Sequence, residues 1–434
     1  MKKRFPILST VVFLITISFL ILWKISQYDW NLSALIGIWS GFAQLNPLYI
    51  PDEFILFKEG GYDGQFFFLI ARYIYEGSSL PFPTLDSFYF RFHRLGLSII
   101  AGITIPFFGA RSYPYSSLFI LTSLHIISSC ILYKITSRIK PSEDSNKANI
   151  KKLEFKADRL NFLSLFYFLS PFSLLGILLL VSDPLLVSLS IIATYLVLFE
   201  RLQIMERKVH SRNNKQIDYY FIFGVIIFCF ALTVRETALF IITPLLLFFI
   251  IEKNFKKTLY LFIPIITYIC FLLWSQSLEV PFAGTLPLRF LDMIDYPLFG
   301  FVKSLEFTDP ISVKQIARES IKFFLFAIYL QLIANAWNIF QYTSKSRVYL
   351  ALLLLPVAGT LGVITIGEQG YWRSFDNLAR MFTMTVPIVI IAKAYFPNYK
   401  DFGFLYSCGI LFLFLIVRVV LITQPMKYVI HYSL

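Results

Sequence analysis

Long apolar stretches recur along almost the entire chain, and this feature constrains the fold more than any other. After residue 113 they run roughly from 114 to 133, 161 to 180, 184 to 199, 219 to 234, 238 to 251, 258 to 274, 321 to 340, 348 to 366, 381 to 397 and 402 to 422. Because 57% of the 434 residues are hydrophobic and only 15% are charged, a soluble core could not bury them all. The sequence therefore predicts an all-α, polytopic transmembrane helical bundle of about 11–12 spans, at about 20 residues each. Residues 1–434 would form a single transmembrane domain.

Basic residues mark the cytoplasmic side. Lys2, Lys3 and Arg4 precede an apolar run from about 5 to 23, which we interpret as an uncleaved first span because no small-residue cleavage site follows it. Further basic residues gather in a loop at 134–160 and near residues 201–215, 253–257, 345–347 and 400. Since basic loops stay on the cytoplasmic side, these clusters explain the formal charge of +13 without a nucleic-acid partner.

The remaining connections belong to the outer face. They are a long first outer loop at 24–94, corners at 182–184 and 235–237, a second outer loop at 275–320 and the segment 367–380. In the first loop, the spacing of apolar residues predicts interfacial helices at Trp30–Phe42 and Gln65–Tyr75. The run 95–110 is short and contains Pro106, so we interpret it as a re-entrant or half-membrane element. An N-terminus that faces outward is the alternative.

The first candidate site is a carboxylate flanked by glycines. Gly61, Tyr62, Asp63, Gly64 and Gln65 stand directly before an apolar helix. Glycine lets the backbone approach a ligand closely, and a helix N-terminus favours anionic groups. Asp63 could therefore meet a phosphate, a metal ion or a hydroxyl, or it could simply cap the helix.

Other ionisable groups lie near the ends of the same outer loop. Arg91 and Arg94 stand where the loop returns to the membrane, and they either bind a lipid phosphate or anchor in ordinary headgroups. Asp52 and Glu53 are either further ligands or a solvated pair, and the solvated pair is the simpler interpretation.

The two corners carry the next candidates. Asp183, followed by Pro184, is either a functional carboxylate or a helix N-cap. Arg235 and Glu236 either line a polar cavity or form a salt bridge that holds helices together.

Three arginines lie late in the chain. Arg373 and Arg380 belong to the outer segment before a span, where they could hold an anionic lipid headgroup. Arg418 lies within the last apolar run, and we expect it to extend toward the membrane surface.

Several kinds of chemistry lack a sequence signature. No metal-ligand cluster, catalytic triad or nucleotide-binding fingerprint appears in the sequence. A transferase with this sequence would therefore take its donor from a membrane lipid rather than from a dissolved nucleotide sugar.

Taken together, the basic N-terminus with one span, the Gly-Tyr-Asp-Gly-Gln-Phe motif at 61–66, the Tyr-Phe-Arg-Phe-His-Arg motif at 89–94 and the two corners resemble the polytopic glycosyltransferases of the GT-C superfamily. The likeness is closest to bacterial members whose loop reads Tyr-Asp-Gly-Gln-Phe-Tyr, and it is more remote from the mannosyltransferases of GPI-anchor assembly. It covers most of the chain as architecture, but only these short motifs as sequence.

The resemblance implies a sugar donor linked to a polyprenyl phosphate, a lipid or glycan acceptor, and a site at the periplasmic face of a bacterial inner membrane. Asp63 matches the family's acidic residue, so it would act as the general base of an inverting transfer, with a pKa raised by a partly apolar site. The expected substrate-binding residues are Arg91, Arg94, Asp183, Arg235, Glu236, Arg373 and Arg380, and Gly61, Tyr62, Gly64 and Gln65 would shape the loop. No motif requires a cofactor, and a divalent cation, Mg²⁺ or Mn²⁺, is the one that the resemblance allows.

Two other functions fit the same composition. A transporter or lipid flippase would use the buried charges to line a substrate path, although the sequence shows none of the internal repeats common in transporters. A polymerase or ligase of surface polysaccharide would also use a lipid-linked donor, and the second outer loop keeps this alternative open.

Overall fold

The computed structural model describes residues 5–77, 79–138, 163–199, 202, 219–278, 294–305, 313–373, 375–396, 399, 402–422 and 425–432. Lys2, Lys3 and Arg4, most of the basic loop 134–160 and parts of the loop 275–320 therefore lie outside the described residues.

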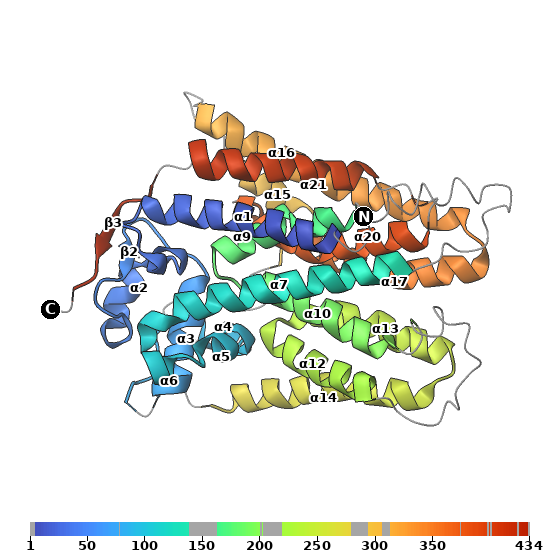
Figure 1. The fold of residues 1–434 in the computed structure, drawn as a ribbon, viewed down its shortest axis with the longest axis horizontal. Coiled ribbons are helices and arrows are strands. Elements are labelled where there is room, and N and C mark those ends of the chain that lie inside the picture. The colour runs from blue at the N-terminus through green and yellow to red at the C-terminus, as the bar shows by residue number, and fades with distance from the viewer. Residues whose placement is uncertain are drawn as a thin grey trace.

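Helices dominate the structure, and their lengths are those of a membrane protein (Figure 1). Within the part of the chain that the structure describes, seven helical segments are long and apolar enough to cross a bilayer: Phe5–Ser26, Ala110–Ser137, Phe255–Gln276, Arg318–Gln341, Ser344–Ile366, Phe375–Tyr395 and Gly403–Leu421. Five shorter apolar helices accompany them among the described residues: Gly96–Phe108, Leu163–Leu178, Asp183–Val197, Tyr219–Val234 and Glu236–Ile251. The chain is therefore an all-α, multi-pass membrane protein, as predicted. Reaching about 11–12 crossings requires the shorter helices as well.

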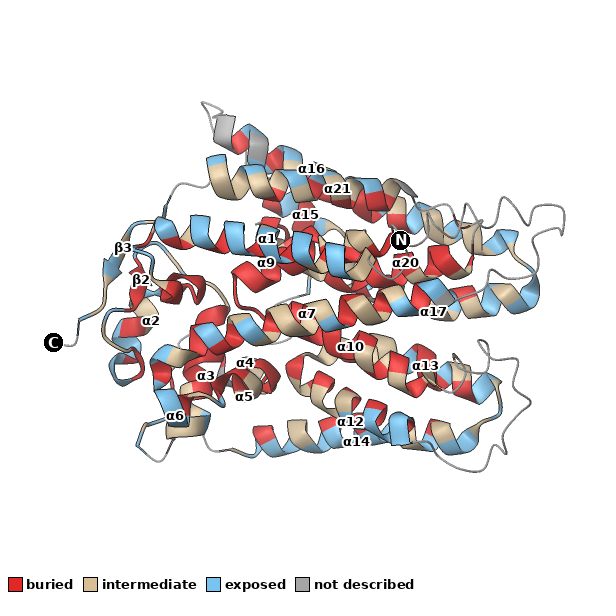
Figure 2. Cartoon of the chain, in the orientation of Figure 1, coloured by how far each residue is buried: buried red, intermediate tan, exposed pale blue. Residues whose placement is uncertain are grey.

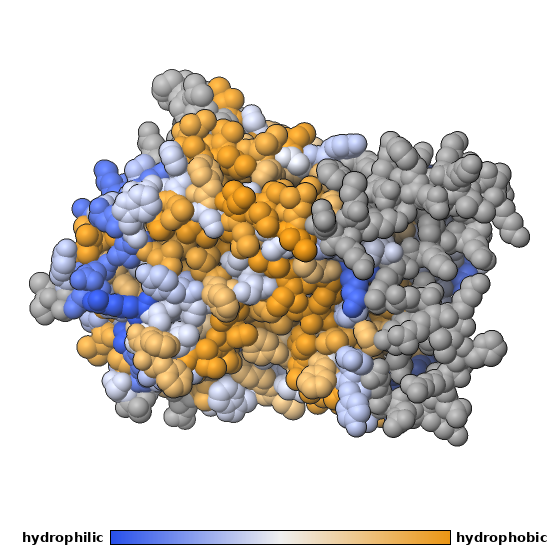
Figure 3. All heavy atoms as spheres, in the orientation of Figure 1, coloured by the Kyte–Doolittle hydropathy of each residue, from blue (hydrophilic) through white to orange (hydrophobic). Residues whose placement is uncertain are grey.

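The bundle has a covered centre and an apolar outside. In the centre, every residue of α9 (Pro171–Leu178) and most of α10 (Asp183–Val197) is buried, whereas α1 (Phe5–Ser26) and α14 (Phe255–Gln276) expose apolar side chains (Figure 2). On the face drawn in Figure 3, apolar residues cover the middle of the molecule and hydrophilic residues gather at one end. An apolar belt of this kind is what contact with lipid tails requires.

The remaining helices pack around this centre. α12 (Tyr219–Val234) packs against α10 and α14, and α13 (Leu239–Ile251) packs against α17 (Ser344–Ile366). The other described α-helices of the second half are α15 (Phe299–Ser304), α16 (Val313–Ala336), α18 (Gln369–Arg373), α19 (Phe375–Met381), α20 (Thr385–Tyr395) and α21 (Phe402–Val417). α15 contacts α18, so residues 299–304 of the second outer loop lie beside the segment 367–380.

A small three-stranded sheet covers one end of the bundle. β1 (Ile38–Trp39) pairs in parallel with β2 (Ile55–Phe57), and β2 pairs antiparallel with β3 (Tyr428–Ile430), with Leu56 opposite Val429. The C-terminal strand thus lies at the same end of the bundle as the first outer loop (Figure 1). This arrangement agrees with the alternation of basic clusters in the sequence.

The first outer loop differs in part from its prediction. The single helix expected at Trp30–Phe42 is wrong, because that stretch forms a 3-10 turn at Leu32–Leu35, the strand β1 and the start of α2 (Ser40–Leu45). Gly37 adopts a φ of 72° between the turn and the strand. A residue with positive φ interrupts a helix, so apolar spacing alone misrepresented this segment.

α3 (Gly64–Glu76) confirms the helix expected at Gln65–Tyr75, but not its interfacial position. Every residue from Gly64 to Ala71 is buried. The helix packs against α5 (Gly96–Gly102), where the Ser98 hydroxyl donates a hydrogen bond of 2.8 Å to the Phe67 carbonyl. Protein therefore covers the N-terminal half of α3.

The run 95–110 forms two short helices, α5 and α6 (Ile105–Phe108). Together they extend from Gly96 to Phe108, which at 1.5 Å per residue is about 20 Å and less than the ~30 Å hydrocarbon thickness. The next helix, α7 (Tyr113–Arg138), is a full span. These lengths favour the half-membrane interpretation of the run.

Candidate functional site

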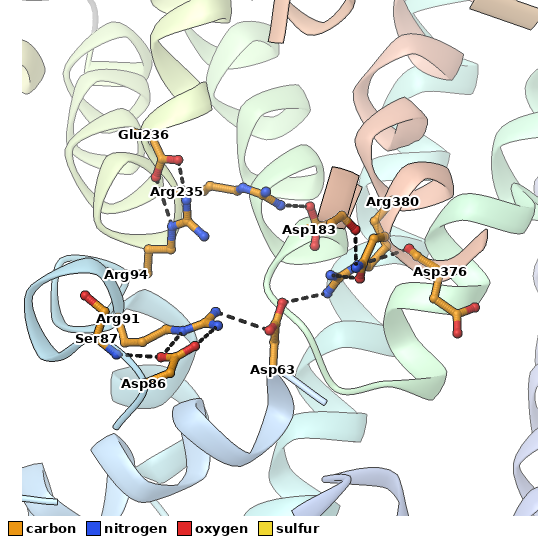
Figure 4. A network of polar contacts seen from close by, with 12 residues as sticks. Asp63, Asp86, Ser87, Arg91, Arg94, Asp183, Arg235, Glu236, Asp376 and Arg380 are labelled. Carbon is orange, nitrogen blue, oxygen red and sulfur yellow. Dashed lines mark hydrogen bonds and ion pairs between the residues drawn. The ribbon is translucent and has the colours of Figure 1, made fainter. Parts of the chain in front are cut away.

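Asp63 lies immediately before α3, yet its side chain makes no capping hydrogen bond. Its carboxylate reaches two arginines from distant parts of the chain (Figure 4). Oδ1 is 3.2 Å from Nη1 of Arg91, and Oδ2 is 3.0 Å from Nη1 of Arg380. The Asp63 side chain remains 31% exposed. Asp63 thus occupies the N-cap position without capping the helix through its side chain, and its carboxylate joins the first outer loop to α19.

Arg91 belongs to the short helix α4 (Phe88–Phe92) and turns into the protein. Its Nε and Nη2 donate to the two carboxylate oxygens of Asp86, at 2.8 and 2.6 Å, and its guanidinium lies 4.2 Å from the centre of the Phe66 ring. Because its side chain is only 12% exposed, Arg91 is not a headgroup anchor. Asp86 was not among the predicted site residues. Its position only five residues before Arg91 could have indicated that the two side chains pair.

Arg94 also turns inward and pairs with Glu236. Its Nε lies 3.1 Å from Oε2 and its Nη2 lies 2.5 Å from Oε1, a two-pronged arrangement that suits a guanidinium and a carboxylate. His93 Nε2 lies 3.6 Å from the same carboxylate. Glu236 thus ties the return of the first outer loop to the corner between α12 and α13.

Arg235 pairs with Asp183 rather than with its neighbour Glu236. The predictions for both corners need correction. Asp183 is not the N-cap of α10 but its first residue, and Ser182 is the N-cap. The salt bridge joins Arg235 at one corner to Asp183 at the other. Nη2 of Arg235 lies 3.8 Å from the Met381 sulfur, and its buried Nε has no hydrogen-bond partner among the residues that the structure describes.

Asp183, Arg235 and Arg380 line one narrow pocket. Its free volume is about 20 Å³, which is space for about one water molecule. Three threonines, two methionines and apolar side chains complete the wall: Thr237, Thr360, Thr383, Met381, Met384, Leu186, Val187 and Phe240. The pocket continues the site from Asp63 toward the centre of the bundle, because Arg380 belongs to both.

Asp376 is a further buried carboxylate that the sequence did not single out. Arg418 forms a two-pronged ion pair with it, so the prediction that Arg418 extends toward the membrane surface is wrong. The Tyr62 hydroxyl donates to Oδ2 of Asp376 at 3.2 Å, and Nε of Arg380 donates to its backbone carbonyl at 3.2 Å. Asp376 therefore connects the last membrane helix to the Asp63 motif.

The glycines around Asp63 permit close packing of backbone on backbone. A Cβ on Gly64 would lie 2.6 Å from the Ile36 carbonyl oxygen, and one on Gly61 would lie 2.5 Å from that of Gly37. Gln65 accepts a hydrogen bond of 3.0 Å from the Trp39 amide. What approaches these two glycines is therefore protein backbone rather than a ligand.

These ion pairs form one group, which we call the Asp63 cluster. Its members are the carboxylates Asp63, Asp86, Asp183, Glu236 and Asp376 and the arginines Arg91, Arg94, Arg235, Arg380 and Arg418. Each arginine contacts at least one carboxylate, and the formal charges balance. Any anionic ligand would therefore have to compete with carboxylates that already hold the arginines.

The charge environment also sets the protonation of Asp63. Burial opposes ionisation, but the positive charges of Arg91 and Arg380 outweigh it and hold the pKa of Asp63 well below its usual value. The expectation of a raised pKa is therefore wrong for the protein without substrate.

The other predicted positions lie apart from this cluster or do not suit a metal ion. Arg373 is exposed at the end of α18, and Glu53 forms an exposed ion pair of 3.2 Å with Arg111. Within the described residues, no group of three or more His, Cys, Asp or Glu side chains could hold a metal ion. The cluster's carboxylates already face arginines, so this donor set does not fit a divalent cation.

No protein family, curated protein or solved structure matches this chain. Functional inference therefore depends on the geometry of the Asp63 cluster and on the sequence motifs that form it.

Proposed function

We propose that the chain is an inverting glycosyltransferase of the GT-C type. It would move a sugar from a polyprenyl-phosphate donor to a lipid or glycan acceptor at the periplasmic face of a bacterial inner membrane. The observation that carries the proposal is the environment of Asp63: a partly exposed carboxylate, freed from helix capping, held between two arginines from different elements. A base and the cations that a leaving phosphate needs are thus in direct contact.

The donor phosphate would be received by Arg235 and Arg380. Arg235 has a buried Nε that no described residue hydrogen-bonds, and both side chains line the pocket beside Asp183. The pocket has no room for a phosphate until a side chain moves. Arg380 contacts Asp63 through Nη1 alone, while its Nε and Nη2 donate to the Asp376 carbonyl and to Asn377 Oδ1. A movement that turns Nη1 toward the phosphate would therefore release Asp63.

Release of Arg380 would turn Asp63 into a base. The ionised form would lose one of its two stabilising charges, so the pKa of Asp63 would rise when the donor binds. Asp63 would then accept the proton of the acceptor hydroxyl while that oxygen bonds to the anomeric carbon. The bond from the anomeric carbon to the phosphate oxygen would break, and the phosphate would keep the electron pair.

Substitution of Asp63 tests the assignment. Asp63→Asn keeps the size of the side chain but removes the basic oxygen, so transfer of a radiolabelled sugar in reconstituted vesicles should fall by about 100-fold or more. Glu53→Gln is the matched control, because Glu53 is an exposed acid of the same loop and should be dispensable. Transfer by Asp63→Asn at the wild-type rate would remove Asp63 from the mechanism.

The same vesicles separate a transferase from a transporter or flippase. A transferase releases polyprenyl phosphate as the glycosylated acceptor accumulates. Movement of intact lipid-linked sugar across the bilayer, with no free polyprenyl phosphate, would favour the transport alternative instead.

A further inference from the structure

A second pocket lies at the opposite end of the bundle from the sheet. It has a volume of about 410 Å³ and opens between the end of α13 and the first turns of α17 (Figure 1). Its lining consists of Ile251, Glu252, Lys253, Lys345, Val348 and Tyr349. The Asp63 cluster shares none of these residues, so this pocket needs a separate explanation.

The two lysines of this pocket differ from Lys257 and Arg347, which make contacts with other residues. Lys257 lies over the Phe221 ring, at 5.3 Å, and Arg347 donates to the backbone carbonyls of Phe340 and Tyr342, at 3.2 and 3.1 Å. For the ammonium groups of Lys253 and Lys345, by contrast, the structure gives no hydrogen bond or ion pair within the part of the chain that it describes.

The start of α17 adds to the positive potential. The helix has 23 residues, and its N-cap, Thr343, makes no side-chain capping hydrogen bond. Amide groups in the first turn of a helix lack partners within the helix, and the helix dipole places partial positive charge there. Two free ammonium groups and a helix N-terminus thus converge on one cavity, a combination that suits an anion.

One carboxylate in the pocket opposes an anion. Glu252 accepts a hydrogen bond of 2.6 Å from the Tyr349 hydroxyl, which fixes its position beside the cavity. The lining therefore carries two positive charges and one negative charge, and the net charge is positive. Removing the negative charge of Glu252 should therefore strengthen the binding of an anion.

The outside of the pocket identifies the source of the anion. Ile251 and Val348 are 47% and 43% exposed, and their neighbours Ile250 and, one turn back along α13, Leu247 are also exposed. Apolar side chains thus continue from the cavity along the lipid-facing surface. A phospholipid could place its headgroup phosphate between the lysines and its acyl chains along α13 and α17.

We propose that this pocket binds the headgroup of an anionic phospholipid, with Lys253, Lys345 and the N-terminus of α17 contacting the phosphate. The site is independent of sugar transfer. It would secure the end of the bundle remote from the Asp63 cluster to the leaflet richest in anionic lipid.

Native mass spectrometry of the purified full chain tests the site, with phosphatidylglycerol and phosphatidylcholine as probes. The wild type should retain phosphatidylglycerol in preference to phosphatidylcholine. The double variant Lys253→Gln, Lys345→Gln should bind phosphatidylglycerol roughly 30-fold more weakly, and Glu252→Gln should bind it several-fold more tightly. The matched control is Lys58→Gln, Lys427→Gln, which removes the same charge from exposed positions at the sheet end and should leave binding unchanged.

Three outcomes would overturn the proposal. One is equal retention of the two lipids by the wild type. Another is equal weakening by the control and the pocket variants, which would indicate a general effect of charge. The third is complete displacement of phosphatidylglycerol by millimolar inorganic phosphate, which would indicate a site for free anions. Equal melting temperatures of the variants would show that folding is not the cause of any difference.

Discussion

The ion pair between Asp183 and Arg235 gives a stability prediction that the geometry makes specific. Their side chains are 7% and 15% exposed, and the Arg235 guanidinium donates to Asp183 and, more weakly, to the Met381 sulfur. Removing one partner leaves a buried charge without compensation, which in proteins costs about 3–5 kcal/mol. We therefore expect Asp183→Asn to destabilise the protein by about 3 kcal/mol, since the asparagine keeps one hydrogen bond.

Replacing both partners should cost less than replacing one. In the double variant Asp183→Leu, Arg235→Met no buried charge remains, so we expect it to unfold at a higher temperature than Asp183→Asn. Thermal unfolding in detergent, followed by intrinsic fluorescence, measures both, and Asp183→Asn should lower the midpoint by roughly 5 °C. Lys427→Gln, which breaks an exposed contact of 3.9 Å, is the control expected to show no shift. A double variant less stable than Asp183→Asn would refute this reasoning.

Three further predictions follow from the packing and charge of the site. Gly64→Ala should lower expression and the melting temperature, because its Cβ would lie 2.6 Å from the Ile36 carbonyl oxygen; normal folding would refute the assigned close approach. Arg94→Met should destabilise the protein by about 1–2 kcal/mol, because the partly exposed Glu236 would lose its guanidinium partner and keep His93, at 3.6 Å, and adding Glu236→Gln should recover part of the loss; no recovery would contradict direct coupling. Because the pKa of Asp63 is lowered by folding from 3.8, its ionised form stabilises the protein above that pH. The stability difference between wild type and Asp63→Asn should therefore stay constant from about pH 5 to 8 and shrink on further acidification; a change near pH 7 would show that the pKa is not lowered.

Local sequence patterns predicted much of the membrane architecture. The apolar run at the N-terminus and the last run correspond to the spans Phe5–Ser26 and Gly403–Leu421, because span length and hydropathy are properties of contiguous residues. From the rule that basic loops stay inside, we also predicted that the motifs of Asp63, Arg94 and Glu236 lie on one face. Their ion pairs confirm that these groups lie at one site.

The partners within the site could not be predicted in the same way. Tyr62 and Asp376 are 314 residues apart in the chain, and no local period relates them. Asp86 and Asp376 look like ordinary polar residues until the fold brings Arg91 and Arg418 to them. The predicted direction of the Asp63 pKa shift was wrong for the same reason. The pKa depends on two arginines from distant parts of the chain rather than on the motif itself.

The strand β3 could not be predicted from local sequence either. Residues 428–430 follow the last membrane helix and show no obvious partner in the sequence, yet they complete a sheet begun by the first outer loop. Only the arrangement of the whole bundle brings the two ends of the chain together.

In the proposed mechanism, Asp63 is held ionised by its arginines and becomes a base when the donor phosphate draws Arg380 away. The pH dependence of sugar transfer tests this mechanism most directly. The kcat/KM for the donor reports the pKa of the base in the free enzyme, and kcat reports its pKa in the complex with donor. We predict that kcat falls on acidification at a clearly higher pH than kcat/KM does, and that Arg380→Gln brings the two profiles closer together. Coincident profiles in the wild type would contradict the release of Asp63 by the donor.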